Sequence, residues 1–247
     1  MFKINNLEDL KKTIEENPSI INEFKYKHVI NKYDIRTYNL YMYVCMYGTP
    51  IMLKYLETHF SNVKDFKDEK NTDSYLIASS GGNLEVMKYL EKEHNWNIHV
   101  KDNNQNDAYL IVSYYGCIEI MKYLEKEHNW DIHVKNNYYG YNAYLIAIAY
   151  GNLEIIKYLE KEHNFSPITD RYYGYDAYSL ASYNGQLEIM KYLEKEHNWN
   201  IYMHKLYKYE LYYDAKRYGQ IKIIKYLENK MFYEKLSNIV NNFLEKS

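Results

Sequence analysis

The sequence predicts an all-α solenoid of about six helix-turn-helix repeats, with short protruding finger loops and a helical cap at each end. One phrase, Gly-x-Leu-Glu-Ile-x-Lys-Tyr-Leu-Glu, carries this prediction, and clear copies begin at Gly82, Gly116, Gly151 and Gly185. Weaker copies begin at Gly48 and Gly219, so the six glycines are spaced by 34, 34, 35, 34 and 34 residues. A fixed period of this length is typical of stacked repeats that contact only their neighbours.

Each copy of the phrase predicts a pair of helices. A short apolar block, such as residues 108–113, precedes each glycine and predicts the first helix, and the phrase itself predicts the second. Side-chain caps for the first helices are expected at Asp73, Asp107, Asn142 and Asp176. The apolar positions of the second helix are Leu84, Val86, Met87, Tyr89 and Leu90. These residues cover more of the helix surface than one apolar stripe, which indicates that neighbouring helices pack against the second helix on two sides.

Glycine and asparagine mark the expected helix ends. The six repeat glycines should end the first helices with positive φ, a conformation that costs least without a Cβ. The second helices should end in the same conformation at Asn95, Asn129, Asn164 and Asn198. Gly140 and Gly174 should supply the positive φ of tight turns at two finger tips.

The period divides the chain into an array and two caps. Residues 1–38 are predicted to be an N-terminal cap, a degenerate repeat with helices near residues 6–14 and 19–30. Residues 39–232 hold the repeats 39–72, 73–106, 107–141, 142–175, 176–209 and 210–232. Residues 233–247 place Leu236, Ile239, Val240, Phe243 and Leu244 at helical spacing, which predicts a C-terminal capping helix. Such caps cover the terminal apolar faces of a solenoid.

At the level of these residues the repeat resembles the ankyrin repeat. The Gly-x-Leu-Glu-Ile-x-Lys-Tyr-Leu run looks like the start of its second helix, and Lys101-Asp102 looks like the beginning of its finger. The resemblance covers about residues 39–232. It implies a non-enzymatic scaffold or adaptor that binds a protein through finger tips and first helices. The Thr-Pro-Leu-His opening of that family is replaced by residues such as Asp107-Ala-Tyr-Leu110, so its hydrogen bonds must be absent or rebuilt.

Two further comparisons bear on the resemblance. A tetratricopeptide array has the same period, but its proline near the end of each repeat is not matched by Pro18, Pro50 and Pro167. The bias toward tyrosine, asparagine and lysine resembles that of ankyrin proteins encoded by large DNA viruses of amoebae. A viral origin is therefore expected from composition alone.

Composition and charge argue against several other classes of protein. Lys+Arg 31 against Asp+Glu 33 gives a formal net charge of -2, whereas proteins that bind nucleic acid through phosphates usually carry a basic excess. No apolar run approaches the roughly 18 residues of a membrane span, and the first residues lack the apolar segment of a signal peptide. Cys45 and Cys117 have no metal-ligand spacing and indicate reduced thiols. We expect a cytoplasmic monomer (host cytoplasm, if viral) without a cofactor.

Histidines and aromatic residues recur in register along the repeats. His94, His128, His163 and His197 share one slot, which leaves a metal-binding or pH-sensing protein as the alternative function. Zinc, however, needs histidine nitrogens at about 2.0–2.1 Å from the ion, whereas the axes of packed helices lie about 8–10 Å apart. Histidines of neighbouring repeats could therefore share a zinc ion only with strain. The row Trp96, Trp130, Phe165 and Trp199 is interpreted as packing between repeats. The charges of Lys-Tyr-Leu-Glu-Lys-Glu are expected on a solvated face. No catalytic motif is found.

The candidate binding surface is rich in tyrosine, a residue that occurs 33 times. The candidates lie in two fingers or next to a helix-ending glycine: Tyr114, Tyr115, Tyr138, Tyr139, Tyr141, Tyr150, Tyr172, Tyr173, Tyr175 and Tyr183. Tyrosine gives a large contact area at a low cost in side-chain entropy. Two alternatives remain open: the tyrosines are filler from an A+T-rich genome, or the repeats form an RNA-binding array that stacks bases on them.

Overall fold

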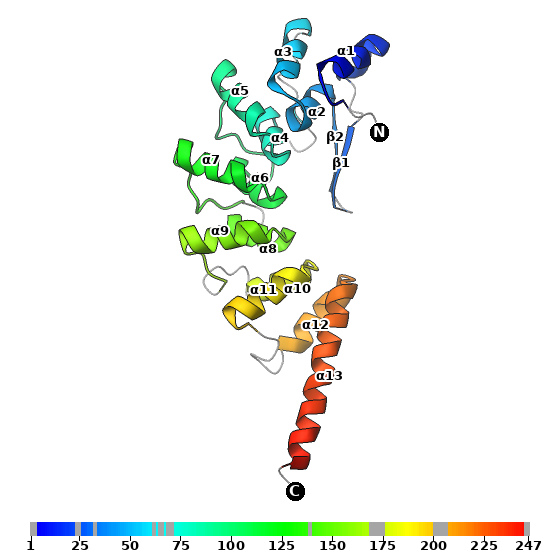
Figure 1. Cartoon of the computed structure of the whole chain (residues 1–247), viewed down its shortest axis with the longest axis vertical. Coiled ribbons are helices and arrows are strands. Elements are labelled where there is room, and N and C mark those ends of the chain that lie inside the picture. Colours follow the sequence, from blue (N-terminus) through cyan, green and yellow to red (C-terminus); the bar gives the residue numbers. More distant parts are fainter. Residues whose placement is uncertain are drawn as a thin grey trace. The chain divides into compact units, whose positions relative to one another are not determined.

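Figure 1 shows the computed structural model, which describes residues 4–22, 26–31, 34–60, 63, 67, 72–137, 140–167, 176–199 and 207–244. The chain forms two compact units, Met1–Ala143 and Tyr144–Ser247. Apart from one short hairpin near the N-terminus, every regular element in the described residues is helical. The helices follow one another in antiparallel pairs, so the predicted all-α repeat solenoid is confirmed.

The first unit contains the hairpin and the first three helix pairs. Its elements are α1 (Leu7–Glu16), the 3-10 helix η1 (Pro18–Asn22), β1 (Tyr26–Asn31), β2 (Asp34–Tyr38), α2 (Leu40–Tyr47), α3 (Pro50–His59), α4 (Ser74–Ser80), α5 (Leu84–His94), α6 (Ala108–Tyr115) and α7 (Ile118–His128). The first helices α2, α4 and α6 contact one another in sequence and form one layer. The second helices α3, α5 and α7 lie beside them in a second layer (Figure 1).

The second unit continues the same alternation of helices. It contains α9 (Leu153–His163), α10 (Ala177–Tyr183), α11 (Leu187–His197), α12 (Tyr207–Arg217) and α13 (Ile221–Leu244), and α8 (Ala143–Tyr150) begins at the unit boundary. α13 is one continuous helix of 24 residues. The capping helix expected from residue 233 is therefore the second half of α13 and not a separate element. Its side chains lie outside the described residues, so their capping role stays a prediction.

The first helices form the core of each unit. In α6, Tyr109, Leu110 and Val112 are fully buried, and Ile111 is 4% exposed. A helix that is buried on every side needs neighbours on every side, which only stacked repeats supply. Burying such a side chain contributes about 1.5–3 kcal/mol, so the stack itself is the main source of stability.

Three of the four predicted helix caps are confirmed. Asp73 Oδ1 accepts from the backbone N–H groups of Tyr75 and Leu76 at 3.1 Å. Asp107 Oδ1 accepts from Leu110 N at 3.1 Å, and Asp176 Oδ1 accepts from Ser179 N at 2.8 Å. These acceptors satisfy N–H groups that have no partner inside the helix. An Asp cap thus rebuilds the start of the first helix without the threonine of the family pattern.

Positive φ is found at most of the predicted helix ends. The asparagines Asn95, Asn129, Asn164 and Asn198 have φ from 47° to 57°, and Gly82, Gly116, Gly151, Gly185 and Gly219 have φ from 68° to 81°. Gly140 at a finger tip has φ 65°, as predicted, whereas Gly174 lies outside the described residues.

The prediction of positive φ was wrong for Gly48, whose φ is -93°. The cause lies two residues later, at Pro50, which starts α3. A residue before proline is restricted to extended ψ, and Thr49 has ψ 160°. The corresponding residue Asn83 has ψ 73°. Because the proline straightens Thr49, the turn between the two helices takes a different path through Gly48.

The helix predicted near residues 19–30 was also wrong, because this segment forms η1 and a β-hairpin. β1 and β2 pair antiparallel, with Tyr26 opposite Tyr38 and Val29 opposite Ile35. The segment holds β-branched and aromatic residues, which favour strands, and Asn31 and Asp34 flank the connection. The preceding helix was predicted correctly: α1 starts after Asn6, whose Oδ1 accepts from Asp9 N at 2.9 Å.

Valine at Gly219 or at Gly151 is expected to destabilise the second unit to different extents. A Cβ on Gly219 meets nothing within 4 Å, so only the left-handed backbone (φ 68°) opposes Gly219→Val, at about 1 kcal/mol. A Cβ on Gly151 meets Gln186 Oε1 at 2.4 Å. Gln186 Nε2 donates to Ala149 O at 3.0 Å, so Gly151→Val also costs this hydrogen bond, about 1 kcal/mol more. Denaturant unfolding of both variants measures the difference, and equal losses would contradict this account.

Candidate functional site

The described finger loops are closed by buried polar side chains at their bases. Asp102 is 1% exposed, and its Oδ1 accepts from the backbone N–H groups of Asn104 and Asn106 at 2.9 Å. In the next finger, Asn136 Oδ1 accepts from Tyr141 N at 3.2 Å, and Asn136 N donates to Tyr141 O at 3.0 Å. Each buried side chain thus fixes the two ends of its loop against each other.

The candidate tyrosines next to the helix-ending glycines lie at the C-terminal ends of first helices. Tyr114 and Tyr115 end α6, are half-buried, and have ring centroids 5.0 Å apart. Tyr150 ends α8 and is 40% exposed. Tyr183 ends α10, and its ring centroid lies 4.1 Å from that of Tyr218. In each unit the ends of the first helices therefore carry closely spaced aromatic rings.

Of the finger candidates, only Tyr141 belongs to the described residues, and it is half-buried. The other five lie outside them: Tyr138, Tyr139, Tyr172, Tyr173 and Tyr175. Two tyrosines in the same slot were missed, Tyr47, which is 51% exposed, and Tyr218, which is 38% exposed. Both directly precede a repeat glycine, so extending the pattern to the weak copies at Gly48 and Gly219 would have found them.

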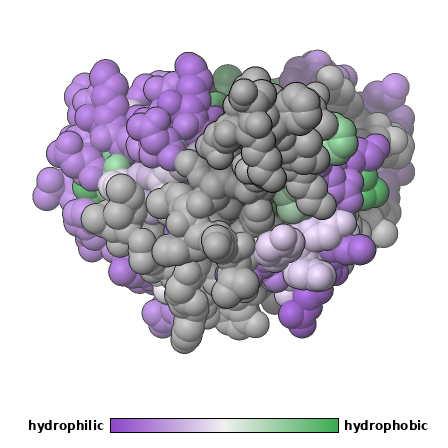
Figure 2. Space-filling view, turned by 90° about the horizontal axis from the view of Figure 1, so that it is seen from below, coloured by the Kyte–Doolittle hydropathy of each residue, from purple (hydrophilic) through white to green (hydrophobic). Residues whose placement is uncertain are grey.

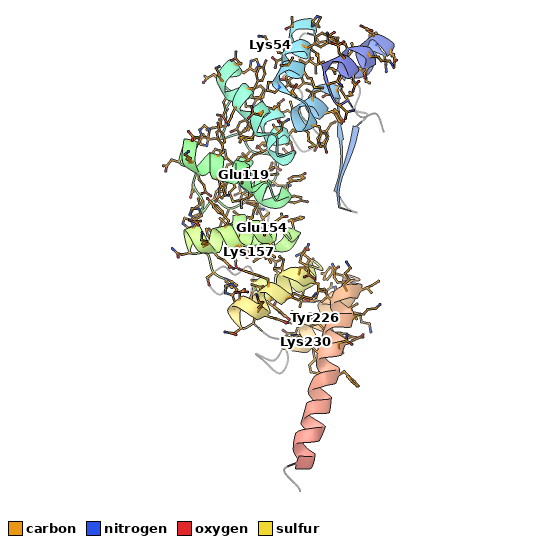
Figure 3. All side chains as sticks on the ribbon, viewed as in Figure 1. Lys54, Glu119, Glu154, Lys157, Tyr226 and Lys230 are labelled. Atoms are coloured by element: carbon orange, nitrogen blue, oxygen red, sulfur yellow. The ribbon has the colours of Figure 1, made fainter. Side chains whose placement is uncertain are left out.

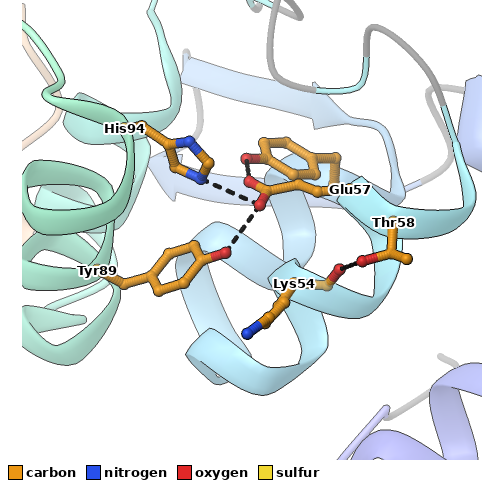
Figure 4. A network of polar contacts seen from close by, with 6 residues as sticks. Lys54, Glu57, Thr58, Tyr89 and His94 are labelled. Carbon is orange, nitrogen blue, oxygen red and sulfur yellow. Dashed lines mark hydrogen bonds and ion pairs between the residues drawn. The ribbon is translucent and has the colours of Figure 1, made fainter.

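A second set of tyrosines, buried or half-buried, donates hydrogen bonds to glutamates inside each unit. Figure 4 shows the network around Glu57 of α3, in which three donors from two repeats meet one carboxylate. Tyr41 donates its O–H to Glu57 Oε1 at 2.8 Å, and Tyr89 of the next repeat donates to Oε2 at 2.8 Å. His94 Nε2 lies 3.0 Å from the same Oε2. One carboxylate thus joins the first helix of its own repeat to the second helix of the next.

The same arrangement recurs along both units. Glu91 accepts from Tyr75 and Tyr123 at 2.7 Å each, with His128 Nε2 at 3.2 Å. In the second unit Glu160 accepts from Tyr144 and Tyr192, and Glu194 accepts from Tyr178, Tyr226 and Lys230. Figure 3 labels Tyr226 and Lys230 on α13. Tyr109 with Glu125 and Tyr212 with Glu228 show the contact within a repeat. We call these carboxylates the hub glutamates.

The hub glutamates correct one expectation about charged residues. The Lys-Tyr-Leu-Glu-Lys-Glu segment was expected on a solvated face, but the Glu91 side chain is only 17% exposed. The following Lys92 and Glu93 side chains are 83% and 51% exposed, so the expectation holds for them.

His94, His128 and His197 contact a hub glutamate of an earlier repeat. Within the described residues, no group of three His, Cys, Asp or Glu side chains could hold a metal ion.

Ten described tyrosines donate to a glutamate. Burial raises the pKa of the Tyr41 and Tyr75 hydroxyls well above its ordinary value, and the neighbouring carboxylate adds to the rise. Burial also raises the pKa of the Cys117 thiol to about 11, so this thiol is protonated at neutral pH. These residues hold repeats together and provide no activated nucleophile.

The predicted aromatic row is largely buried, and Trp130 stacks on His99 of the preceding repeat, with ring centroids 4.8 Å apart. Trp130, Phe165 and Trp199 are 8%, 7% and 5% exposed. Trp96 is half-buried, and its Nε1 donates to Asp73 Oδ2 at 3.0 Å. Burial raises the pKa of Asp73, whereas the hydrogen bond from Trp96 opposes that rise. An aromatic residue after the second helix thereby supports the Asp cap of the first.

Comparison with known protein families identifies the class of protein. The family model for ankyrin repeats (3 copies) matches residues 75–167 and 110–203. The chain therefore belongs to the ankyrin repeat family, whose repeats are generally protein-interaction modules. No curated protein matches the chain, and the viral origin expected from composition has no support from a relative. No helix in the described part of the chain is long and apolar enough to cross a membrane.

Proposed function

We propose that this ankyrin repeat protein is a non-catalytic scaffold or adaptor, and that it binds a protein through its finger loops and the ends of its first helices. The observation that carries the proposal is that both units have partly exposed tyrosines at the ends of their first helices, Tyr47 in the first unit and Tyr150 and Tyr218 in the second. Hydrogen bonds also close the bases of two finger loops in the first unit. Tyrosine is enriched at protein interfaces, where its ring adds contact area and its hydroxyl orients the partner.

The face of the molecule drawn in Figure 2 is mainly hydrophilic where it is coloured. In the view of Figure 2, hydrophilic residues (purple) make up most of the coloured surface, and hydrophobic residues (green) show only as small separate areas. A contact built on single tyrosines therefore fits better than one built on a large apolar patch. The formal net charge of -2 favours a protein partner over an RNA. A cytoplasmic location, in a host cell if the chain is viral, is part of the proposal.

Replacing the six finger tyrosines Tyr138, Tyr139, Tyr141, Tyr172, Tyr173 and Tyr175 with serine is expected to weaken partner capture at least tenfold, which is about 1.4 kcal/mol. Interface energy concentrates in a few aromatic residues, and the helix faces that stack the repeats are left intact. Helicity and thermal midpoint should therefore stay nearly unchanged. Affinity capture from the native cell, with circular dichroism on each variant, measures both quantities.

The matched control uses charged residues of the outer helices. Lys122 pairs with Glu119 at 3.3 Å, and Lys157 pairs with Glu154 at 3.8 Å, on α7 and α9 (Figure 3). Changing these four to alanine should alter capture little, since exposed pairs contribute about 0–1 kcal/mol. Glu125 and Glu160 are unsuitable controls because they are hub glutamates. If the outer set abolishes capture and the tyrosines do not, the surface is wrongly assigned. If a labelled RNA binds instead, the partner class is wrong.

A further inference from the structure

The last repeat departs from the others where α12 turns into α13. In four repeats the second position of the second helix is an acid: Glu85, Glu119, Glu154 and Glu188. In the last repeat this position is Lys222. Two further cations, Lys216 and Arg217, end α12 at positions that are uncharged in every other repeat. The change of charge is therefore confined to one end of one helix pair.

These cations are exposed and have no acidic partner among the described residues. Lys216, Arg217, Lys222 and Lys225 are all exposed, and none forms an ion pair with another described residue. In the preceding repeat, Lys191 pairs with Glu188 at 2.8 Å, whereas the residue three positions before the equivalent Lys225 is Lys222. Residues 214–225 carry four cations and one acid, the half-buried Asp214, for a net charge of +3 in a chain of -2.

Stability does not account for Lys222. A cation in the first turn of a helix opposes the helix dipole, and like charges three residues apart repel, each by a few tenths of a kcal/mol or more. Glutamate, which the other four repeats use, would favour the helix on both counts. Lys216 and Arg217 end a helix, where a cation is favourable, so Lys222 is the residue that calls for another role.

Apolar side chains lie among the cations. Ile221 is 65% exposed and Tyr218 is 38% exposed, and the Arg217 guanidinium lies 5.6 Å from the centroid of the Tyr218 ring. Arg217 and Lys222 are five residues apart, so their Cα atoms are within about 19 Å. One short ligand can therefore contact both cations and the two apolar side chains between them.

We propose that the surface formed by Lys216, Arg217, Tyr218, Ile221, Lys222 and Lys225 binds an acidic segment of a partner protein, with an apolar side chain seated on Tyr218 and Ile221. Charge complementarity selects the acidic segment, and the exposed apolar pair favours a peptide over a bare polyanion. This inference rests on the proposed function and names the chemistry of one part of the partner. The finger tyrosines are different residues, so separate variants test the two proposals.

The test uses the full chain and a fluorescently labelled peptide of aspartate and glutamate with one central leucine. Fluorescence anisotropy should show binding that weakens as salt is added. Lys222→Glu should weaken binding at least tenfold and leave the thermal midpoint equal or higher, because it restores the charge pattern of the other repeats. Lys126→Glu makes the same change of charge on a lysine whose side chain is 84% exposed. It should change the affinity by no more than about twofold.

Several outcomes would overturn the inference. One is an equal loss in the Lys222→Glu and Lys126→Glu variants, which indicates general charge attraction. Absence of peptide binding to the native chain is another. Equally tight binding of a single-stranded RNA that competes with the peptide would assign the surface to nucleic acid. The variant with six serines in the fingers separates the two proposals. If the serine variant loses partner capture but still binds the peptide, both proposals stand. If Lys222→Glu loses peptide binding while the serine variant still captures the partner, only the finger proposal fails.

Discussion

Glu91→Ala is expected to lower the free energy of unfolding by about 3 kcal/mol. Glu91 is the only acceptor described for the hydroxyls of Tyr75 and Tyr123, and His128 contacts the same carboxylate. Removing it leaves buried or half-buried donors unsatisfied in two neighbouring repeats, at about 1–3 kcal/mol for each. The contact between α5 and α7 is weakened at the same time. Urea unfolding followed by circular dichroism measures the loss.

The neighbouring Glu93 gives the matched control. It lies on the same helix two residues later, its side chain is 51% exposed, and its contact is with the adjacent Lys92 at 3.8 Å. Glu93→Ala should therefore change stability by no more than about 0.5 kcal/mol. Glu91→Gln should fall between the two, because an amide keeps one acceptor oxygen and loses the charge. Similar losses at Glu91 and Glu93 would show that the hub contacts contribute no more than surface charges.

Raising the pH above about 10 is expected to unfold the protein steeply. Burial raises the pKa of Tyr41 and Tyr75 above the ordinary value of 10.0. Above pH 10 these hydroxyls keep their protons in the folded chain and lose them in the unfolded chain. The unfolded state then binds fewer protons, so stability that is complete below pH 10 falls as the pH rises. Each tyrosine contributes about 1.4 kcal/mol per pH unit, so these two alone contribute about 3 kcal/mol per unit.

Two signals recorded together test this pH dependence. The thermal midpoint by circular dichroism should be level from pH 8 to about 10 and then fall. Ultraviolet absorbance of tyrosinate should show a rise that coincides with unfolding, as Tyr41 and Tyr75 lose their protons. Tyr89, Tyr123 and Tyr192 also have raised pKa values from burial, but solvent screens them more and their share is smaller. Titration of all tyrosines in a single early phase, with the fold intact, would contradict the buried networks.

The sequence was sufficient for everything that depends on local chemistry repeated at a fixed period. A glycine after each first helix, an asparagine after each second helix and an Asp cap before the next determined where most helices begin and end. The exceptions have local causes of their own. Pro50 redirected the turn at Gly48, and strand-forming residues outweighed a weak helical pattern between residues 26 and 38.

The residues of the proposed binding surface were predicted less completely, because the exposure of a tyrosine side chain depends on how the neighbouring repeats pack around it. Tyr109 and Tyr115 lie on one helix, yet Tyr109 is fully buried and Tyr115 is half-buried. A tyrosine can pack, bind a carboxylate or face a partner, and its residue type favours none of these. The positions next to a repeat glycine identified part of the proposed surface, and extending them to Gly48 and Gly219 adds Tyr47 and Tyr218.

Only the tertiary structure decided which charges are internal. Tyr75 precedes Glu91 by 16 residues and Tyr123 follows it by 32, and both spacings recur in the sequence without indicating a contact. Whether these groups meet depends on how far one helix pair is displaced and rotated against the next, and the packing of the first helices sets that displacement. The period of the sequence determined that repeats stack. The packing between repeats buried the first glutamate of the Lys-Tyr-Leu-Glu-Lys-Glu segment, which the sequence alone places on a solvated face. That glutamate then joins neighbouring repeats through its hydrogen bonds.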